Sequence, residues 1–194
     1  MSQSAPSTAT PEQYERWFTQ TPDPWTELPK LEHGGDRTRF RSIEDAVRSA
    51  NAAQAVALEK KLLAVLAVPG CTDAARLFVV RLLAIVGGTD TAAALTDWVA
   101  DPKRTDLARV ALDPNPAALV DEAYRAALLP LTGAAQLGLI GSIAERGDRV
   151  AMPALERLAA DGSAPADTRA AAKRAVAQLG RPAGGPPALP GGAR

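Results

Sequence analysis

The densest group of chemically active side chains is basic. Arg37, Arg39 and Arg41 alternate with other residues and flank the aromatic ring of Phe40. Guanidinium groups bind phosphate in a bidentate manner and an aromatic ring stacks on a base, so the pattern could hold a phosphate or a single nucleic-acid strand. The same arginines could instead neutralise the acids between positions 27 and 36, or solvate the start of the helix that follows.

The residues that catalytic sites usually require are scarce in this sequence. His33 is the only histidine and Cys71 the only cysteine, which removes paired-histidine metal sites, histidine-dependent triads and internal disulfides. Asp121 and Glu122 are adjacent, and neighbouring residues of a helix diverge by about 100°, so they do not converge on one proton or metal. No glycine-rich nucleotide-binding motif is present. We therefore expect no catalytic residue, no metal and no cofactor, and we interpret the protein as a non-enzyme.

An aromatic segment near the N-terminus is the other candidate for binding a partner. Trp17, Phe18 and Trp25 lie close together in the sequence. Tryptophan is costly to leave exposed and is a favoured anchor of protein interfaces. The alternative is that these rings cover the first helices of the domain. Together with Phe40 and the three arginines, they form the candidate partner-binding set.

The composition favours helices. Hydrophobic residues make up 46% of the 194 residues, but aromatic residues only 4%. Alanine and leucine dominate, and alanine has the highest helix propensity and lets neighbouring backbones approach closely. The length suits one domain of ordinary size. The sequence therefore predicts an all-α fold.

The formal net charge is zero, whereas nucleic-acid-binding domains usually carry a basic face. The two ends differ in sign: residues 1–36 contain six acids and two bases, and residues 162–194 contain one acid and five bases. Head-to-tail association of copies through these ends is one interpretation, and unrelated solvated termini are the other. No apolar run approaches the roughly 20 residues that span a bilayer, and no secretory signal is evident. We expect a cytoplasmic location.

Three regions are predicted along the chain. Residues 1–41 comprise a disordered start, a short helix over 11–20 and an irregular arm that could cap the domain. Residues 42–180 form the helical domain, with Ser42 as its first cap, and residues 181–194 form a disordered Pro/Gly-rich tail. Apolar periodicity and Pro or Gly breaks predict helices at 42–67 (one or two), 73–86, 91–100, 104–112, 117–129, 134–146, 150–160 and 166–179.

The helical region is weakly self-similar. Residues 82–101 recur in altered form as residues 142–161, so that Gly87 aligns with Gly147 at an offset of sixty positions. Each helix pair has an apolar face that it cannot bury alone, and stacking of pairs would cover these faces. The sequence thus predicts a stacked array of two-helix units.

The segments DAARLFVVRLLAIVG (73–87) and ADTRAAAKRAVAQLG (166–180) resemble the second helix of bacterial HEAT repeats. The resemblance extends over about 42–180 and implies a short α-solenoid of about four HEAT-like helix pairs. It also implies that arginines at the starts of second helices, here Arg76, Arg109 and Arg169, bridge adjacent repeats.

We therefore expect a non-catalytic protein-interaction or scaffold module that holds another protein, of unspecified identity, on its helical surface or its aromatic arm. The alternative function is that of a HEAT-like enzyme or accessory domain that acts on nucleic acid, like a DNA glycosylase, or on a bilin. Neutral charge and a single tryptophan within the array, Trp98, disfavour the glycosylase reading.

Overall fold

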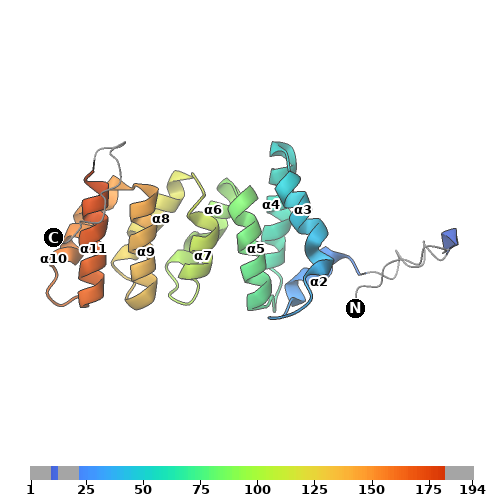
Figure 1. The fold of residues 1–194 in the computed structure, drawn as a ribbon, viewed down its shortest axis with the longest axis horizontal. Helices are drawn as coiled ribbons and strands as arrows, with labels where there is room; N and C mark the ends of the chain where they lie inside the picture. The colour runs from blue at the N-terminus through green and yellow to red at the C-terminus, as the bar shows by residue number, and fades with distance from the viewer. Residues whose placement is uncertain (1–9, 13–21, 182–194) are drawn as a thin grey trace, which may run out of the picture. The chain divides into compact units, whose positions relative to one another are not determined.

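A computed structural model describes residues 10–12 and 22–181. Every regular element over these residues is helical and none is a strand, which confirms the predicted all-α class (Figure 1). All of the predicted tail over 181–194 except Arg181, and nearly all of the predicted helix over 11–20, lie outside the described residues.

The helices follow the predicted order, with η denoting a 3-10 helix. They are α2 (Pro24–Glu27), η1 (Leu28–Lys30), η2 (Thr38–Phe40), α3 (Arg41–Ser49), α4 (Ala52–Leu66), α5 (Asp73–Val86), α6 (Thr89–Val99), α7 (Thr105–Leu112), α8 (Ala118–Leu128), α9 (Gly133–Arg146), η3 (Arg149–Ala151), α10 (Met152–Ala160) and α11 (Ala166–Leu179).

The predicted helical stretch over 42–67 is two helices. The break falls at Ala50 and Asn51, and Asn51 begins α4 with a capping box in which its side chain and that of Gln54 bond each other's backbone N–H groups. The prediction that Ser42 caps the first helix is wrong. The chain enters α3 directly from η2, and Phe40 at the cap position makes no side-chain cap hydrogen bond.

The chain divides into two compact units. The first contains the described residues up to Leu95 together with Val110–Ala117, and the second contains Thr96–Arg109 and the described residues from Ala118 onward. The division passes through α6 and α7, so each of these helices contributes one end to each unit.

The core of the first unit is built around α5. This helix packs against α3, α4 and η1, and seven of its residues are buried: Ala74, Ala75, Phe78, Val79, Val80, Leu82 and Leu83. The ring of Phe78 lies 5.8 Å from that of Phe40. Ile85, near the end of α5, is exposed.

The arm that precedes α3 is fixed to the start of α5. Leu28 and Leu31 are buried, and the backbone N–H of Thr72 donates to the carbonyl of Pro29 over 3.0 Å. The Thr72 hydroxyl donates to the carbonyl of Leu31 and accepts from the N–H of Ala75 as the N-cap of α5. Residues 28–31 are therefore positioned by the same residue that starts the central helix.

A polar clamp connects α4 to the start of α6. The Glu59 side chain is 4% exposed, and its Oε1 accepts hydrogen bonds from the N–H groups of Gly88 and Thr91, both over 2.7 Å. The Asn115 side-chain amide donates to the carbonyls of Gly87 and Gly88 over 3.3 and 2.8 Å. Because Gly88 and Thr91 stand where a helix leaves N–H groups without an intrahelical partner, Glu59 serves as the cap of α6 from another helix.

In the second unit α9 packs against α8 and α11, and α11 also packs against α10. Ion pairs join the successive elements: Arg146 Nε lies 2.6 Å from Asp121 Oδ1, and Arg125 Nη1 lies 2.7 Å from Asp148 Oδ2. Gly147, at φ 73°, ends α9 in the left-handed conformation that favours glycine. Gly87, which aligns with Gly147 in the sequence, follows α5 at φ −68°, so the two glycines end their helices by different caps.

The three arginines at helix starts behave differently from one another. Arg76 pairs with Asp73 of its own helix over 2.8 Å, and Arg169 donates to carbonyls of the loop before α11. Arg109 crosses from α7 to α9, where its Nε donates to the Ser142 hydroxyl over 2.7 Å. Of the three, Arg109 forms the kind of bridge that the resemblance implies.

Candidate partner-binding groove

The basic cluster lies on the surface, but its aromatic residue does not. Arg37, Arg39 and Arg41 are exposed, whereas Phe40 is 1% exposed and lies in the core of the first unit. A buried ring cannot stack on a base, so we leave Phe40 out of the proposed binding surface. Arg39 Nη1 lies 3.9 Å from Glu27 Oε2.

The surroundings of these arginines are of mixed charge. A cavity of about 190 Å³ beside Arg39 is also lined by three acids, Glu27, Glu32 and Asp36. Hydrogen bonds from Thr38 hold the pKa of Asp36 below its usual value, and a hydrogen bond from Lys30 does the same for the pKa of Glu27. Ionised carboxylates beside the arginines work against binding of a phosphate, since like charges disfavour one another.

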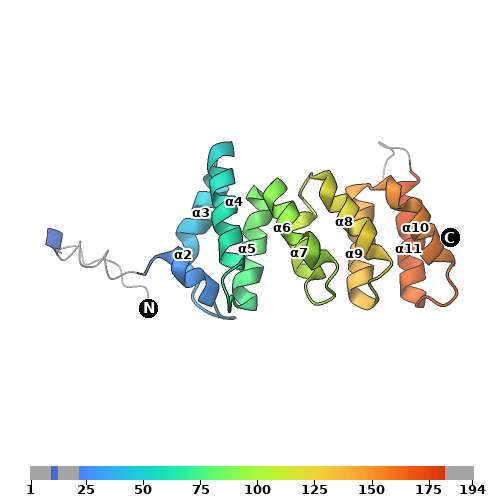
Figure 2. The same cartoon turned by 180° about the vertical axis from the view of Figure 1, so that it is seen from behind.

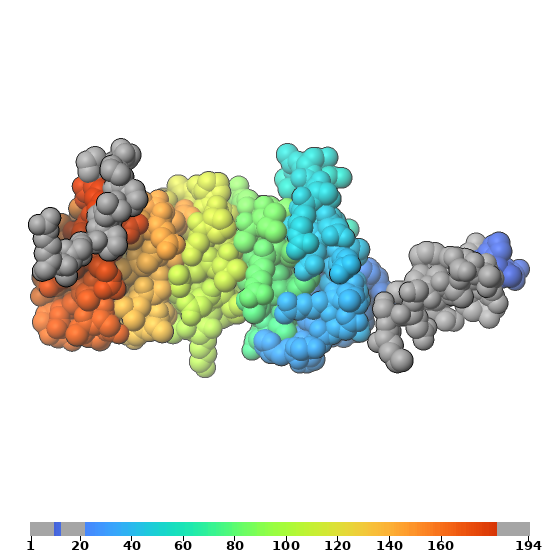
Figure 3. Space-filling model, in the orientation of Figure 1, coloured from blue at the N-terminus to red at the C-terminus, as the bar shows by residue number. Residues whose placement is uncertain are grey.

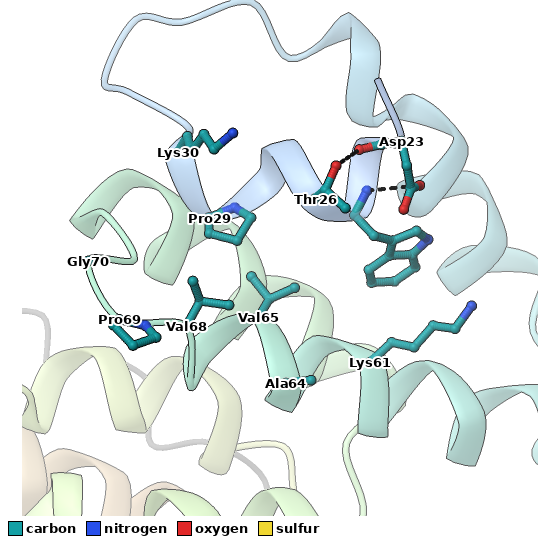
Figure 4. A pocket seen from close by; sticks show the side chains of 11 residues that line it. Asp23, Thr26, Pro29, Lys30, Lys61, Ala64, Val65, Val68, Pro69 and Gly70 are labelled. Carbon is teal, nitrogen blue, oxygen red and sulfur yellow. Dashed lines mark hydrogen bonds between the residues drawn. The ribbon is translucent and has the colours of Figure 1, made fainter. Parts of the chain in front are cut away.

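Trp25 lines a hollow in the first unit, while Trp17 and Phe18 lie outside the described residues. The indole is half-buried and borders a groove of about 520 Å³ between the arm and α4 (Figure 4). Its lining residues are Asp23, Trp25, Thr26, Pro29, Lys30, Lys61, Ala64, Val65, Val68, Pro69 and Gly70. Pro29, from the arm, faces Val65 and Val68 across the groove.

The polar side chains at the rim are mostly engaged within the chain. Asp23 Oδ1 accepts from the N–H of Trp25 over 3.3 Å, and the Thr26 hydroxyl donates to the carbonyl of Asp23 over 2.8 Å. Lys30 Nζ donates to Glu27 Oε1 over 2.8 Å. Lys61 Nζ lies 5.3 Å from the centroid of the Trp25 ring, within the range of a cation–π contact. The groove is thus apolar in its floor and carries one cation, on Lys61, that no described carboxylate pairs within 4.0 Å.

A second cavity continues along the same helix. It measures about 350 Å³ and is lined by Ala46 and Ser49 of α3 and by Gln54, Ala57, Leu58 and Lys61 of α4. Both cavities border Lys61 and are lined by α4. We call the residues that line them the α4 trough. The first turns of α4 extend past the end of α5 in both ribbon views, and the space-filling view shows them as a projection (Figures 1, 2 and 3).

Sequence reasoning found one wall of this groove and missed the other. Trp25 belongs to the predicted partner-binding set, whereas Lys61 and Ala64 were predicted only as part of the helical stretch over 42–67, and Val68 follows that stretch. The signal for them lies in α4 itself, since only Glu59, Leu62 and Val65 of its residues are buried. A helix with this much alanine, valine and leucine normally buries a wider stripe.

The structure holds no arrangement typical of a metal centre within residues 10–12 and 22–181: no three His, Cys, Asp or Glu side chains come together there as ligands. Over the same residues, no helix has the length and apolar character needed to cross a membrane. No family model matches the chain, and no curated protein or solved structure matches it significantly.

Proposed function

We propose that the chain is a non-catalytic protein-interaction module and that the groove between Trp25 and α4 is its binding site. The observation that carries the proposal is the apolar groove of about 520 Å³ with a half-buried tryptophan in its wall. Grooves of this size bury side chains of a partner, and tryptophan is enriched among the residues that contribute most to binding.

The geometry of the groove favours binding over chemistry. Its titratable residues are Asp23, Lys30 and Lys61. Asp23 caps α2 and Lys30 pairs with Glu27, so neither is directed at a shared point where a substrate atom could react. A general acid or base must lie within hydrogen-bond reach of the proton that it moves, together with a second group that polarises the substrate.

Site-specific photo-crosslinking in the native cell tests the proposal. A photoreactive phenylalanine analogue replaces Val68, which lines the groove and is 40% exposed, and in a control it replaces Val150 of the second unit, which is 71% exposed. We expect a discrete covalent protein adduct from position 68 that is lost in the Trp25→Ala background. An identical adduct pattern from both positions, or adducts insensitive to Trp25→Ala, would refute the groove as the site.

We further propose that the helix pairs stack as a short α-solenoid of about four HEAT-like pairs. Packing of sequence neighbours supports this, as in α4 with α5, α8 with α9 and α10 with α11, and so does the sixty-residue offset that aligns Gly87 with Gly147 at the ends of α5 and α9. Small-angle X-ray scattering measures the outcome. Stacked pairs give a rod-like cross-section region, whereas a globular chain of this length has a radius of gyration of about 16 Å.

A further inference from the structure

The α4 trough extends the groove along α4, and another helix could pack along this surface. Ala53, Ala57, Lys61 and Ala64 recur every three or four residues and are all exposed, so they share one face of α4. From Ala53 to Ala64 the track spans about three turns, or roughly 17 Å. Its floor is mostly alanine, and small side chains allow the backbone of another helix to approach closely. The walls come from Ala46 and Ser49 of α3 at one end and from Trp25 and Pro29 of the arm at the other.

The polar groups of the trough favour a helical over an extended occupant. An extended segment brings unpaired backbone N–H and C=O groups that need partners when buried. The rim offers few, because Asp23 and Thr26 bond within α2 and Lys30 bonds Glu27. A helix satisfies its own backbone groups and needs from the groove only apolar contact and selected charges.

The charge of Lys61 further restricts which helix the trough can bind. Lys61 borders both cavities, and none of the described carboxylates lies within salt-bridge distance of it. Its recorded contact is with the Trp25 ring, which leaves its ammonium hydrogens available to an acceptor. Lys61 is exposed, so a carboxylate brought to this point can pair with its ammonium beside the indole, and such charge-assisted bonds are stronger than neutral ones.

We propose that the α4 trough binds an amphipathic helix of another protein that carries an acidic residue midway along its apolar stripe, where it meets Lys61. The inference rests on the proposed function and specifies the chemistry of the partner. The apolar stripe packs on Ala57, Ala64 and Val68, and Trp25 closes one side. The neighbouring Lys60 is exposed as well but lines neither cavity, so it does not take part.

The test uses a displayed library of helical peptides of about four turns, with randomised residues on one face, selected against the full chain. We expect enrichment of an apolar stripe with Asp or Glu at its middle. Selection against Lys61→Glu should replace that acid by Lys or Arg, and the original binders should lose about tenfold in affinity. Lys60→Glu is the matched control and should leave both the selection and the affinities unchanged.

The outcomes separate the two proposals. Apolar binders that depend on Trp25 but show no acidic preference, and bind Lys61→Glu equally well, would overturn the acidic partner and leave the groove in place. Binders insensitive to both Trp25→Ala and Val68→Asp would overturn the groove itself. If the chain alone is a dimer that Val68→Asp dissociates, a second copy is the occupant. If binders emerge only after Trp17 and Phe18 are replaced by serine, the occupant is the chain's own N-terminal segment, and either result overturns the proposal.

Discussion

The clamp at Glu59 makes a quantitative prediction about the first unit. One carboxylate oxygen accepts both the Gly88 and the Thr91 N–H over 2.7 Å, in a position 4% exposed. A hydrogen bond to a charged group contributes about 1.5–3 kcal/mol, and a buried donor left without a partner costs about 1–3 kcal/mol. With partial relaxation and entry of water, we expect Glu59→Ala to lower the free energy of unfolding by about 3 kcal/mol.

Glu59→Gln separates the role of the charge from that of the acceptor. The amide keeps a carbonyl oxygen for the two N–H groups but removes the negative charge at the positive end of α6. Neutral hydrogen bonds are worth about half of charge-assisted ones, so we expect a loss of about 1.5 kcal/mol. The exposed Glu122 of α8 gives the control: Glu122→Ala should change stability by less than about 0.5 kcal/mol.

Urea denaturation followed by far-UV circular dichroism measures the stabilities, and amide hydrogen exchange at Gly88 and Thr91 measures the clamp itself. The denaturant slope should not change, since the substitutions alter stability and not the surface that unfolding exposes. If Glu59→Ala costs no more than Glu122→Ala, or if the Gly88 and Thr91 amides exchange at the wild-type rate, Glu59 does not cap α6 and the reasoning is wrong.

Three further predictions concern single residues. The Thr91 hydroxyl is buried and has no hydrogen-bond partner in the part of the chain that the structure describes, so Thr91→Val should leave the free energy of unfolding unchanged or raise it by up to about 1 kcal/mol; a clear decrease in thermal stability would reveal a partner. A Cβ on Gly138 would lie 2.1 Å from Arg109 Nη1, so Gly138→Ala should displace the guanidinium from Ser142 and destabilise by about 1 kcal/mol, despite the better helix propensity of alanine. In the Arg109→Ala background the same substitution should become stabilising, and a double-mutant cycle shows whether the sign changes. Burial raises the pKa of the Cys71 thiol, so a thiol reagent at pH 8 should react slowly with the folded chain and rapidly in urea; equal rates would contradict its burial.

Helix positions were predictable because the breaks are chemically explicit. Pro69 and Gly70 end the stretch before α5, and the predicted helix over 166–179 coincides with α11. Pro69 lacks the N–H that a helix needs, and Gly70, at φ 79°, adopts a conformation that other residues avoid. The start of α3 was missed because a 3-10 turn, and not the Ser42 side chain, leads the chain into the helix.

The polar contacts across the fold were not predictable from spacing. Glu59 lies 29 residues from Gly88, and a single acid in an apolar helix is normally a solvated surface residue. A signal existed, since Glu59 shares a helical face with Leu62 and would be buried in any packing that buries Leu62. Its acceptor role required the position of α6, which the sequence pattern of α4 does not contain. The groove at Trp25 was partly predictable for the same reason. The cost of exposing an indole can be recognised from the residue itself, but the position of α4, which forms the other wall of the groove, depends on the fold.

The Glu59 hydrogen bonds to the start of α6 also explain why the α4 trough is not covered by another helix. A helix as apolar as α4 would ordinarily be held by a wide buried stripe, yet three of its residues are buried and one of them is Glu59. Two strong hydrogen bonds to the start of α6 replace part of the apolar contact that would otherwise fix α4. Because Glu59 and Leu62 hold α4 from the opposite face, Ala57, Ala64 and the stem of Lys61 remain uncovered. It follows that Glu59→Gln should weaken binding in the trough by loosening α4, although Glu59 lines neither cavity.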